Sequence, residues 1–212
     1  MTIRTARFAL TTVALVASAG AHAQAYVGAS IGRSSIDVDR TARSDAFLDL
    51  GFDGASTTAD DADTAYRVYG GYFFLPYVGV ELAYVDLGRF SFRTDVQPTG
   101  SLSGRTRIRG GEASIVGRLP IGDAFAVYAR AGAYASRVRT RYSGSGSVTV
   151  IDGAERQSKR STEAAYAIGA TYAFNPHWIA RVEWARYDGL GDELTGGKTD
   201  ADIASVGVAY TF

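Results

Sequence analysis

Residues 203–212 read I-A-S-V-G-V-A-Y-T-F, and this stretch decides how the rest of the chain is interpreted. In a β-strand, successive side chains point to opposite faces. One face of this strand would be large and apolar, whereas the other would be small and weakly polar. The apolar face consists of Ala204, Val206, Val208, Tyr210 and Phe212. A soluble sheet would bury that face against a second layer, whereas a membrane barrel would turn it toward lipid.

The same alternation recurs in seven earlier segments. They cover residues 25–33, 64–74, 77–87, 105–119, 125–139, 163–174 and 178–187. Single-chain bacterial outer-membrane barrels have an even number of antiparallel strands. The eight alternating segments therefore predict an all-β fold, an eight-stranded antiparallel transmembrane β-barrel.

The lengths of the connections favour a barrel over a sandwich. Three are short, at residues 75–76, 120–123 and 175–177, and four are long, at residues 34–63, 88–104, 142–162 and 188–202. Short periplasmic turns that alternate with long extracellular loops are typical of outer-membrane barrels. Aromatic residues near the short turns predict a girdle at the membrane interface. They are Tyr72, Phe74, Tyr77, Phe125, Tyr172, Phe174, Trp178 and Phe212.

Residues 1–23 have the features of a secretory signal peptide. The segment begins with Arg4 and Arg7, continues with an apolar run and ends with the small-residue cleavage pattern A-H-A at residues 21–23. The predicted organisation is therefore a signal peptide followed by an outer-membrane barrel domain at residues 24–212. No later segment has the roughly 18 apolar residues of a transmembrane helix.

The amino-acid composition excludes some classes of function. The 22 basic and 22 acidic residues balance, and removing Arg4 and Arg7 with the signal peptide leaves a net charge of −2. A nucleic-acid-binding protein would be strongly basic, so that class is excluded. The sequence has no Cys, no Gly-rich phosphate loop and no His/Cys metal spacing, so we expect neither a cofactor nor a metal.

Five segments resemble, in order, the transmembrane domain of OmpA. They are A-Y-V-G-A-S-I-G at 25–32, P-Y-V-G-V-E-L-A-Y-V-D-L-G-R at 76–89, L-P-I-G-D at 119–123, V-Y-A-R-A-G at 127–132 and I-A-R-V-E-W at 179–184. The chain is thereby identified as a member of the OmpA-like, opacity-type outer-membrane barrels. The resemblance implies a protein of the Gram-negative outer membrane that the barrel-assembly machinery inserts through its C-terminal strand. Longer members also carry a peptidoglycan-binding domain, an activity that we do not expect here.

Strand parity places eight charged side chains inside the predicted barrel. They are Arg67, Glu81, Glu112, Arg118, Arg130, Glu163, Arg181 and Glu183. Buried charges persist when they are paired, and four of each sign would fill an eight-stranded lumen with ion pairs. The resemblance implies that the family's interior network is kept at Glu81, Arg130, Arg181 and Glu183. Val116 and Thr171 stand where the family tends to have charged residues, so the pairing must differ in detail.

Two functions are consistent with such a barrel. A lumen plugged by ion pairs indicates a structural or surface-interaction protein, which supports envelope integrity and binds a host or phage surface through its loops. Alternatively, the same charges would line a narrow porin-like channel for small solutes or ions. An eight-stranded interior is just wide enough for side chains, and this width favours the plug.

We expect no enzymatic activity. His177, in the predicted turn at 175–177, is the only histidine outside the signal peptide, and no serine lies next to it. Nucleophilic catalysis needs a nucleophile and a base within hydrogen-bond reach. The segment 34–63 is rich in aspartate, but its spacing matches no calcium loop, which favours a solvated acidic loop over a metal site.

Six arginines lie just beyond the predicted membrane segment, on the outward face. They are Arg105, Arg107, Arg109, Arg137, Arg139 and Arg141. With a turn at residues 120–123, antiparallel pairing predicts that Arg107 lies near Arg137 and Arg105 near Arg139. Like charges opposite one another destabilise a sheet. The patch therefore predicts either a bound anion, such as the phosphates of lipopolysaccharide, or a solvated rim in which salt screens the repulsion.

Overall fold

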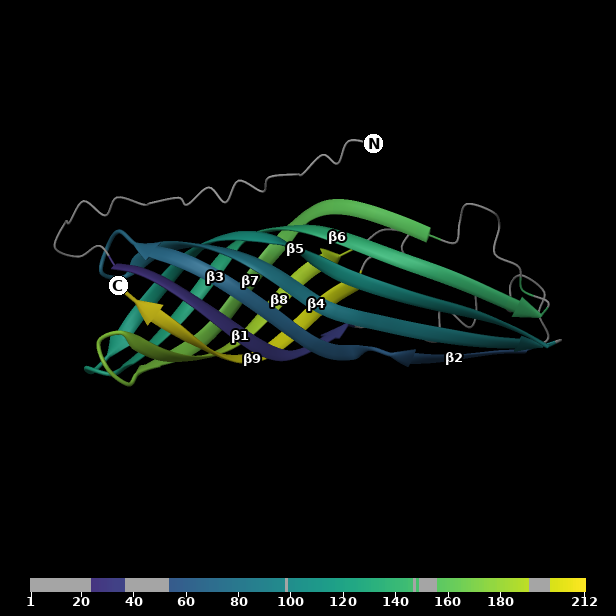
Figure 1. The fold of residues 1–212 in the computed structure, drawn as a ribbon, viewed down its shortest axis with the longest axis horizontal. Coiled ribbons are helices and arrows are strands. Elements are labelled where there is room, and N and C mark those ends of the chain that lie inside the picture. Colours follow the sequence, from purple (N-terminus) through teal and green to yellow (C-terminus); the bar gives the residue numbers. More distant parts are fainter. Residues whose placement is uncertain (1–23, 37–53, 98, 147, 149–155, 191–198) are drawn as a thin grey trace, which may run out of the picture.

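The structure, a computed structural model, describes residues 24–36, 54–97, 99–146, 148, 156–190 and 199–212. These residues form nine β-strands (Figure 1). The strands are β1 (Gln24–Ile36), β2 (Gly54–Asp60), β3 (Ala62–Phe73), β4 (Val78–Gln97), β5 (Gly100–Ile121), β6 (Phe125–Gly146), β7 (Arg156–Ala173), β8 (Trp178–Leu190) and β9 (Thr199–Thr211). No helix in the described part of the chain is long and apolar enough to cross a membrane.

The strands make one closed antiparallel barrel. The order of hydrogen-bonded neighbours runs β4, β3, β1, β9, β8, β7, β6, β5, and the pairing of β5 with β4 closes the ring. β2 and β3 pair with successive parts of β4, so they form one column that is divided at Asp61. The ring therefore has eight columns, and the predicted eight-stranded barrel is confirmed.

The outward faces carry the large apolar side chains. Leu82 and Ile115 are 67% and 63% exposed, although a soluble protein would bury residues of this kind. Of the eight aromatic residues beside the short turns, Tyr72 is half-buried and the other seven are exposed, as a girdle at the membrane interface requires. The exposure pattern therefore places the outward face in lipid.

A second set of exposed aromatic residues lies at the other end of the apolar band. Its members are Tyr66, Tyr84, Tyr166 and Trp184. Sequence analysis did not identify this set, because its members are scattered over four strands. Aromatic side chains gather at both membrane interfaces, so these four residues mark the outer one.

All four predicted long loops are too long. β4 and β5 cover most of residues 88–104, and β6 and β7 shorten the loop predicted at 142–162 from both ends. β1, β2 and β3 occupy parts of 34–63, and β8 and β9 extend into 188–202. Hydroxyl pairs join the extensions; the Oγ1 atoms of Thr106 and Thr140, for example, lie 2.9 Å apart. Polar residues that suggested loops instead form cross-strand pairs. Figure 1 shows β4, β5 and β6 projecting past the ends of β1, β8 and β9.

A β-bulge at Gly88 lets β4 continue. Gly88 has a φ of 94°, in the left-handed region that favours glycine. The register with β5 shifts between Asp86 and Gly88, so the side-chain parity of β4 changes there. Leu87 and Phe90 are consequently both buried. A Cβ atom at position 88 would also lie 2.7 Å from the Asp63 carboxylate.

Two predictions fall on residues outside the described ranges. The predicted signal peptide at 1–23 is one, and the aspartates between residues 37 and 53 are the other. Both stay predictions. The C-terminal strand is described, and β9 pairs with β1 on one side and β8 on the other.

Candidate functional site

The lumen contains a closed ring of alternating arginines and glutamates. In order around the ring, its members are Arg67, Glu81, Arg181, Glu183, Arg130 and Glu112. Six ion pairs link each member to the next and return to the first. All six side chains are buried, and each has two neighbours of opposite charge. This is the condition under which charges persist in a protein interior.

The three arginines are not equally well held. The guanidinium of Arg181 lies 2.7 Å from both Glu81 and Glu183. Arg130 lies 2.9 Å from Glu183 and makes two hydrogen bonds to it. Arg67 pairs with Glu81, but its Nε and Nη1 atoms have no hydrogen-bond partner. Arg67 is therefore the weakest point of the ring.

Each glutamate of the ring also accepts a hydrogen bond from a tyrosine hydroxyl. The pairs, each with an oxygen–oxygen distance of 2.8 Å, are Tyr26–Glu81, Tyr128–Glu183 and Tyr187–Glu112. The hydroxyl of Tyr128 in turn accepts from Arg181 Nε at 2.5 Å. Sequence analysis missed the tyrosines; their inward parity on strands with small neighbours was the signal that could have identified them.

Glycines give the tyrosine rings room to cross the lumen. A Cβ atom at Gly71 would lie 2.2 Å from the ring of Tyr26, and one at Gly169 would lie 2.4 Å from the hydroxyl of Tyr128. Glycine inside a strand often marks such a close approach. The small inward residues and the large ones are thus parts of one packed interior.

Apolar side chains fill the lumen on both sides of the ring. Toward the short turns lie Tyr26, Tyr69, Phe73, Val116, Tyr128 and Ala209. The cluster toward the extended strands includes Val85, Leu87, Ile108, Tyr134, Val138, Tyr187 and Ile203. Cavities of ≈ 60 and ≈ 10 Å³ adjoin the ring, and the smaller one is at the lower limit for a single water.

Arg118, assigned to the lumen network from parity, lies outside the ring. It is half-buried at the short-turn end, where it donates to the Pro76 carbonyl at 3.0 Å and to Gln24 Oε1 at 3.2 Å. Its guanidinium also covers the Phe73 ring, 4.1 Å from the centroid. Arg118 lies near the end of β5, so its long side chain turns toward solvent and not toward the ring of ion pairs.

Glu163 also lies outside the ring. It is buried, and it accepts hydrogen bonds from Ser161 and, at 3.2 Å, from Ser136. Its second carboxylate oxygen has no hydrogen-bond partner within the described ranges. The expected four ion-paired charges of each sign are thus reduced to three of each.

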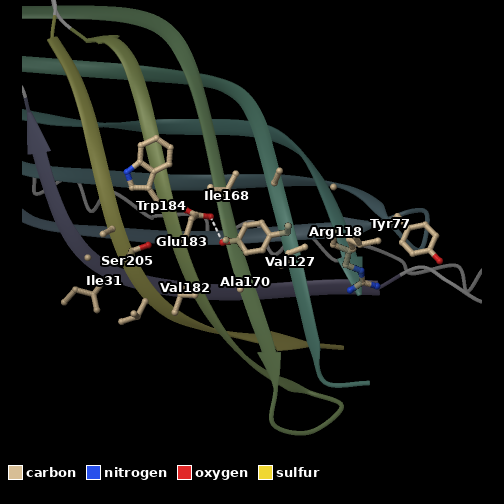
Figure 2. A pocket seen from close by; sticks show the side chains of 18 residues that line it. Ile31, Tyr77, Arg118, Val127, Ile168, Ala170, Val182, Glu183, Trp184 and Ser205 are labelled. Atoms are coloured by element: carbon tan, nitrogen blue, oxygen red, sulfur yellow. Dashed lines mark hydrogen bonds between the residues drawn. The ribbon is translucent and has the colours of Figure 1, made fainter. Parts of the chain in front are cut away.

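The wall itself has a broad hollow between neighbouring strands, drawn in Figure 2. Its labelled residues include Ile31, Ile168, Val182 and Trp184, which belong to the exposed apolar band. The dashed line marks the hydrogen bond of Glu183 with the Tyr128 hydroxyl. Because the hollow continues the lipid-facing surface, we assign it to lipid chains and not to a soluble ligand.

The six rim arginines lie on the outward face, but their register corrects the predicted one. Arg107 is opposite Arg139, and Arg105 is opposite Arg141, a shift of two residues. The cause is the turn, because β5 and β6 pair as far as Ile121 with Phe125. A shift of two residues keeps each side chain on the same face.

The structure extends this patch to neighbouring strands. Arg137 is opposite Arg109 on one side and Arg160 of β7 on the other. In the same way, Arg141 is opposite Arg156, and Arg107 is opposite Arg89 of β4. We call these nine residues the arginine array: Arg89, Arg105, Arg107, Arg109, Arg137, Arg139, Arg141, Arg156 and Arg160. Sequence analysis missed the members on β4 and β7, since it placed both regions in loops.

The opposite side of the rim has a cluster of one arginine and three aspartates instead. Arg186 of β8 pairs with Asp200 at 2.7 Å, Asp188 at 3.1 Å and Asp202 at 3.4 Å. The hydrogen bonds that Arg186 donates to Asp200 and Asp188 raise the pKa of Arg186. The rim is therefore polarised, with excess arginine on β4 to β7 and excess aspartate on β8 and β9.

His177 has a structural place in its turn. Its Nδ1 atom lies 3.0 Å from the Thr211 carbonyl oxygen, and its ring stacks on Tyr210 at 5.4 Å. Asn175 Oδ1 accepts from the backbone N–H groups of His177 and Trp178, both at 2.9 Å. Within the described residues, no group of three or more His, Cys, Asp or Glu side chains could hold a metal ion.

Comparison with known proteins agrees with this architecture. The sequence model of the family described as OmpA-like transmembrane domain matches residues 20–212. Outer membrane protein A of Shigella flexneri is 27% identical over 188 residues, which cover 88% of this chain and 48% of that protein. The one of Yersinia pseudotuberculosis is 30% identical over 145 residues, covering 67% and 38%. The chain spans about half the length of these relatives.

Solved structures with the same fold are more distant in sequence. Neisserial surface protein A has a TM-score of 0.54 with 13% identity, covering 89% of this chain and 97% of that one. Ail of Yersinia pestis, crystallised with the heparin analogue sucrose octasulfate, has a TM-score of 0.52 with 15% identity, covering 90% and 99%. At such identities the likeness concerns the fold alone.

Proposed function

This chain belongs to the family of OmpA-like transmembrane domains, and we propose that it is a non-conducting barrel with a structural and surface-interaction role in the Gram-negative outer membrane. The closed ring of six ion pairs carries the proposal. A structural plug needs every buried charge to be compensated in place, and the ring together with its three tyrosines meets that need.

The apolar layers above and below the ring support the same function. An ion that crossed the barrel would have to break the ring and also pass between Tyr134 and Tyr187, whose rings lie 4.8 Å apart between centroids. Both layers consist mainly of apolar and aromatic side chains, which replace an ion's water shell poorly. A role in envelope integrity follows, because such a barrel adds a rigid wall without a leak.

The projecting strands support a role in surface interaction. β4, β5 and β6 carry their hydrogen-bonded pairing well past the outer aromatic residues, for example at Arg105 with Arg141 and Ser101 with Ser145. Such a rigid platform holds the ends of these strands away from the membrane. We propose that adhesion, through a host or phage surface ligand, uses this end of the molecule.

Insertion by the barrel-assembly machinery through β9 is part of the proposal. The strand has an exposed apolar face that includes Val206 and Val208, and the exposed aromatic residue Phe212 directly follows it. Replacing Phe212 by Ser should lower the amount of folded barrel in the outer membrane, measured by fractionation, without lowering refolding of the purified chain in detergent.

A narrow channel is the alternative, and one observation favours it. The two guanidinium nitrogens of Arg67 without partners leave this side chain freer to change partners than the other two arginines. Its movement would join the ≈ 10 Å³ cavity that it lines to the opposite side of the ring. The alternative therefore makes Arg67 a gate.

Conductance in planar lipid bilayers distinguishes the two functions. The wild-type barrel should give no steps above the protein-free bilayer, whereas Arg181→Ala should give small steps because it opens the ring. The outward substitution Arg33→Ala, on β1, is the matched control and should behave as wild type. A heat-dependent shift in gel mobility verifies that each sample is a closed barrel. Steady wild-type steps that Arg67→Ala enlarges would establish the channel instead.

A further inference from the structure

A groove on the outer surface is walled by three arginines of the array. Arg109 of β5, Arg137 of β6 and Arg160 of β7 stand side by side on neighbouring strands. The groove has a volume of ≈ 270 Å³, and Thr162 is also part of its lining. It is open to the outside, so a group attached to a larger molecule can enter it.

The arginines of this groove have no acidic partners. No carboxylate of the described residues lies within ion-pair distance of Arg109, Arg137 or Arg160, whereas Arg107 pairs with Asp86 at 2.6 Å. The Nε atom of Arg137 is inaccessible to solvent and has no hydrogen-bond partner. Three adjacent cations without a counter-charge destabilise the sheet that holds them unless an anion sits between them.

Repulsion within the array also affects the pKa of Arg137, which lies among the other arginines. The charges of Arg139, and to a smaller extent those of Arg160 and Arg109, lower the pKa of Arg137. Asp86 has the opposite effect on Arg107, whose pKa it raises. An anion in the groove would raise the pKa of Arg137, as Asp86 raises that of Arg107.

The groove lies beyond the outer aromatic residues and extends as far as Arg160, which is six residues past Tyr166 on β7. Tyr84, one of the outer aromatic residues, is opposite Gly111, and the row continues through Ala135 to Thr162. Arg109, two residues beyond Gly111 on β5, therefore stands immediately outside the aromatic boundary of the lipid band. A ligand in this position lies beside the barrel wall, not above its mouth.

We propose that this groove binds a phosphate group of the lipopolysaccharide in the outer leaflet. The proposal rests on the surface-exposed barrel proposed above. The planar guanidinium fork matches the tetrahedral oxygens of phosphate, and three forks would satisfy one doubly charged group. The glycolipid is favoured over a soluble polyanion because its acyl chains would lie on the adjoining apolar band, which includes Ile115 and Ile168.

The test measures binding of purified lipopolysaccharide to the full chain refolded in detergent. Arg137→Gln/Arg160→Gln should weaken binding about tenfold or more, because the variant loses charged hydrogen bonds to the phosphate. The affinity of Arg137→Lys/Arg160→Lys for lipopolysaccharide should lie between those of wild type and the glutamine variant. The lysines keep the charge but lack the planar guanidinium fork. Arg33→Gln/Arg93→Gln removes the same charge from outward positions away from the groove and should bind as wild type. Dephosphorylated lipopolysaccharide should bind wild type as weakly as intact lipopolysaccharide binds the groove variant.

Two results would overturn the inference. One is equal binding by the groove variant and the Arg33→Gln/Arg93→Gln control, which would leave the array as a solvated rim. The other is displacement of lipopolysaccharide from wild type by a heparin oligosaccharide at lower concentration than by added lipopolysaccharide, which would assign the groove to a soluble sulfated glycan. Gel mobility and conductance are recorded on the same samples. A failure of the proposed barrel function is thereby seen separately from a failure of the groove.

Discussion

Two arginines seven residues apart on β6 have opposite surroundings. Arg130 faces the lumen, is 2% exposed, and contacts two glutamates of the ring. Arg137 faces outward, where its neighbours across the strands are Arg109 and Arg160. The same side chain is thus neutralised inside the barrel and left among like charges outside it.

The difference follows from the medium that each face meets. Inside, the low dielectric makes an uncompensated charge costly, so Arg130 is held among glutamates in a closed set of pairs. At the rim, water and salt screen electrostatic repulsion, with a screening length of about 8–10 Å. Unpaired arginines are therefore tolerated there, and they stay available to a ligand. The lumen charges therefore serve stability, whereas the rim charges remain available for the recognition that we propose.

Arg181→Ala should have the largest effect, because it removes two ion pairs from a buried ring. We expect a loss of about 3–5 kcal/mol in the free energy of unfolding. Urea unfolding in detergent measures it, with Arg33→Ala as an outward control that changes by less than about 0.5 kcal/mol. Equal midpoints for the two variants would mean that the lumen is wet and that the contrast between the faces is false.

Arg67→Ala should cost less, roughly 1–3 kcal/mol. Arg67 has two nitrogens without partners, and both of its glutamates keep another arginine and a tyrosine after the change. The same unfolding experiment ranks the two variants. A larger loss for Arg67→Ala than for Arg181→Ala would contradict the unequal distribution of contacts around the ring.

Arg139→Gln should have the opposite sign. The substitution relieves like charges opposite each other in the sheet, at Arg107, and should stabilise the lipid-free barrel by about 0.2–1 kcal/mol. Added salt should shrink the gain, since it already screens the wild-type repulsion. Unfolding at low and high salt tests both statements, and a loss of stability at low salt would show that the rim arginines are compensated after all.

The aspartate cluster should give the smallest effect. The Gly189 backbone N–H, and then Arg186, lower the pKa of Asp200. Its stabilising effect is therefore present above the unfolded-state pKa of about 3.9 and is lost as the pH falls through the lower folded-state value. Because the pair is solvent-exposed, we expect at most about 0.5 kcal/mol. Wild type and Asp200→Asn should differ at neutral pH and converge in acid, and a constant difference would contradict this.

Most of the barrel could be predicted from alternation alone. The period of two identifies which side chains share a face without knowledge of the partner strand, so Glu81, Arg130, Arg181 and Glu183 were assigned to the interior correctly. Strand ends were harder to predict. The segment after Gly88 looks polar and irregular in the sequence, yet it continues as a strand because a bulge resets its parity.

The sequence by itself determined the faces, because parity is a property of one strand. Only the tertiary structure decided the partners, because Arg181 and Glu81 are 100 residues apart and meet only across a closed lumen. The pairing of β6 with β7 likewise placed Arg160 beside Arg137, through a register that neither strand sets alone. Pairing is a property of the whole ring, so no single stretch of sequence contains it.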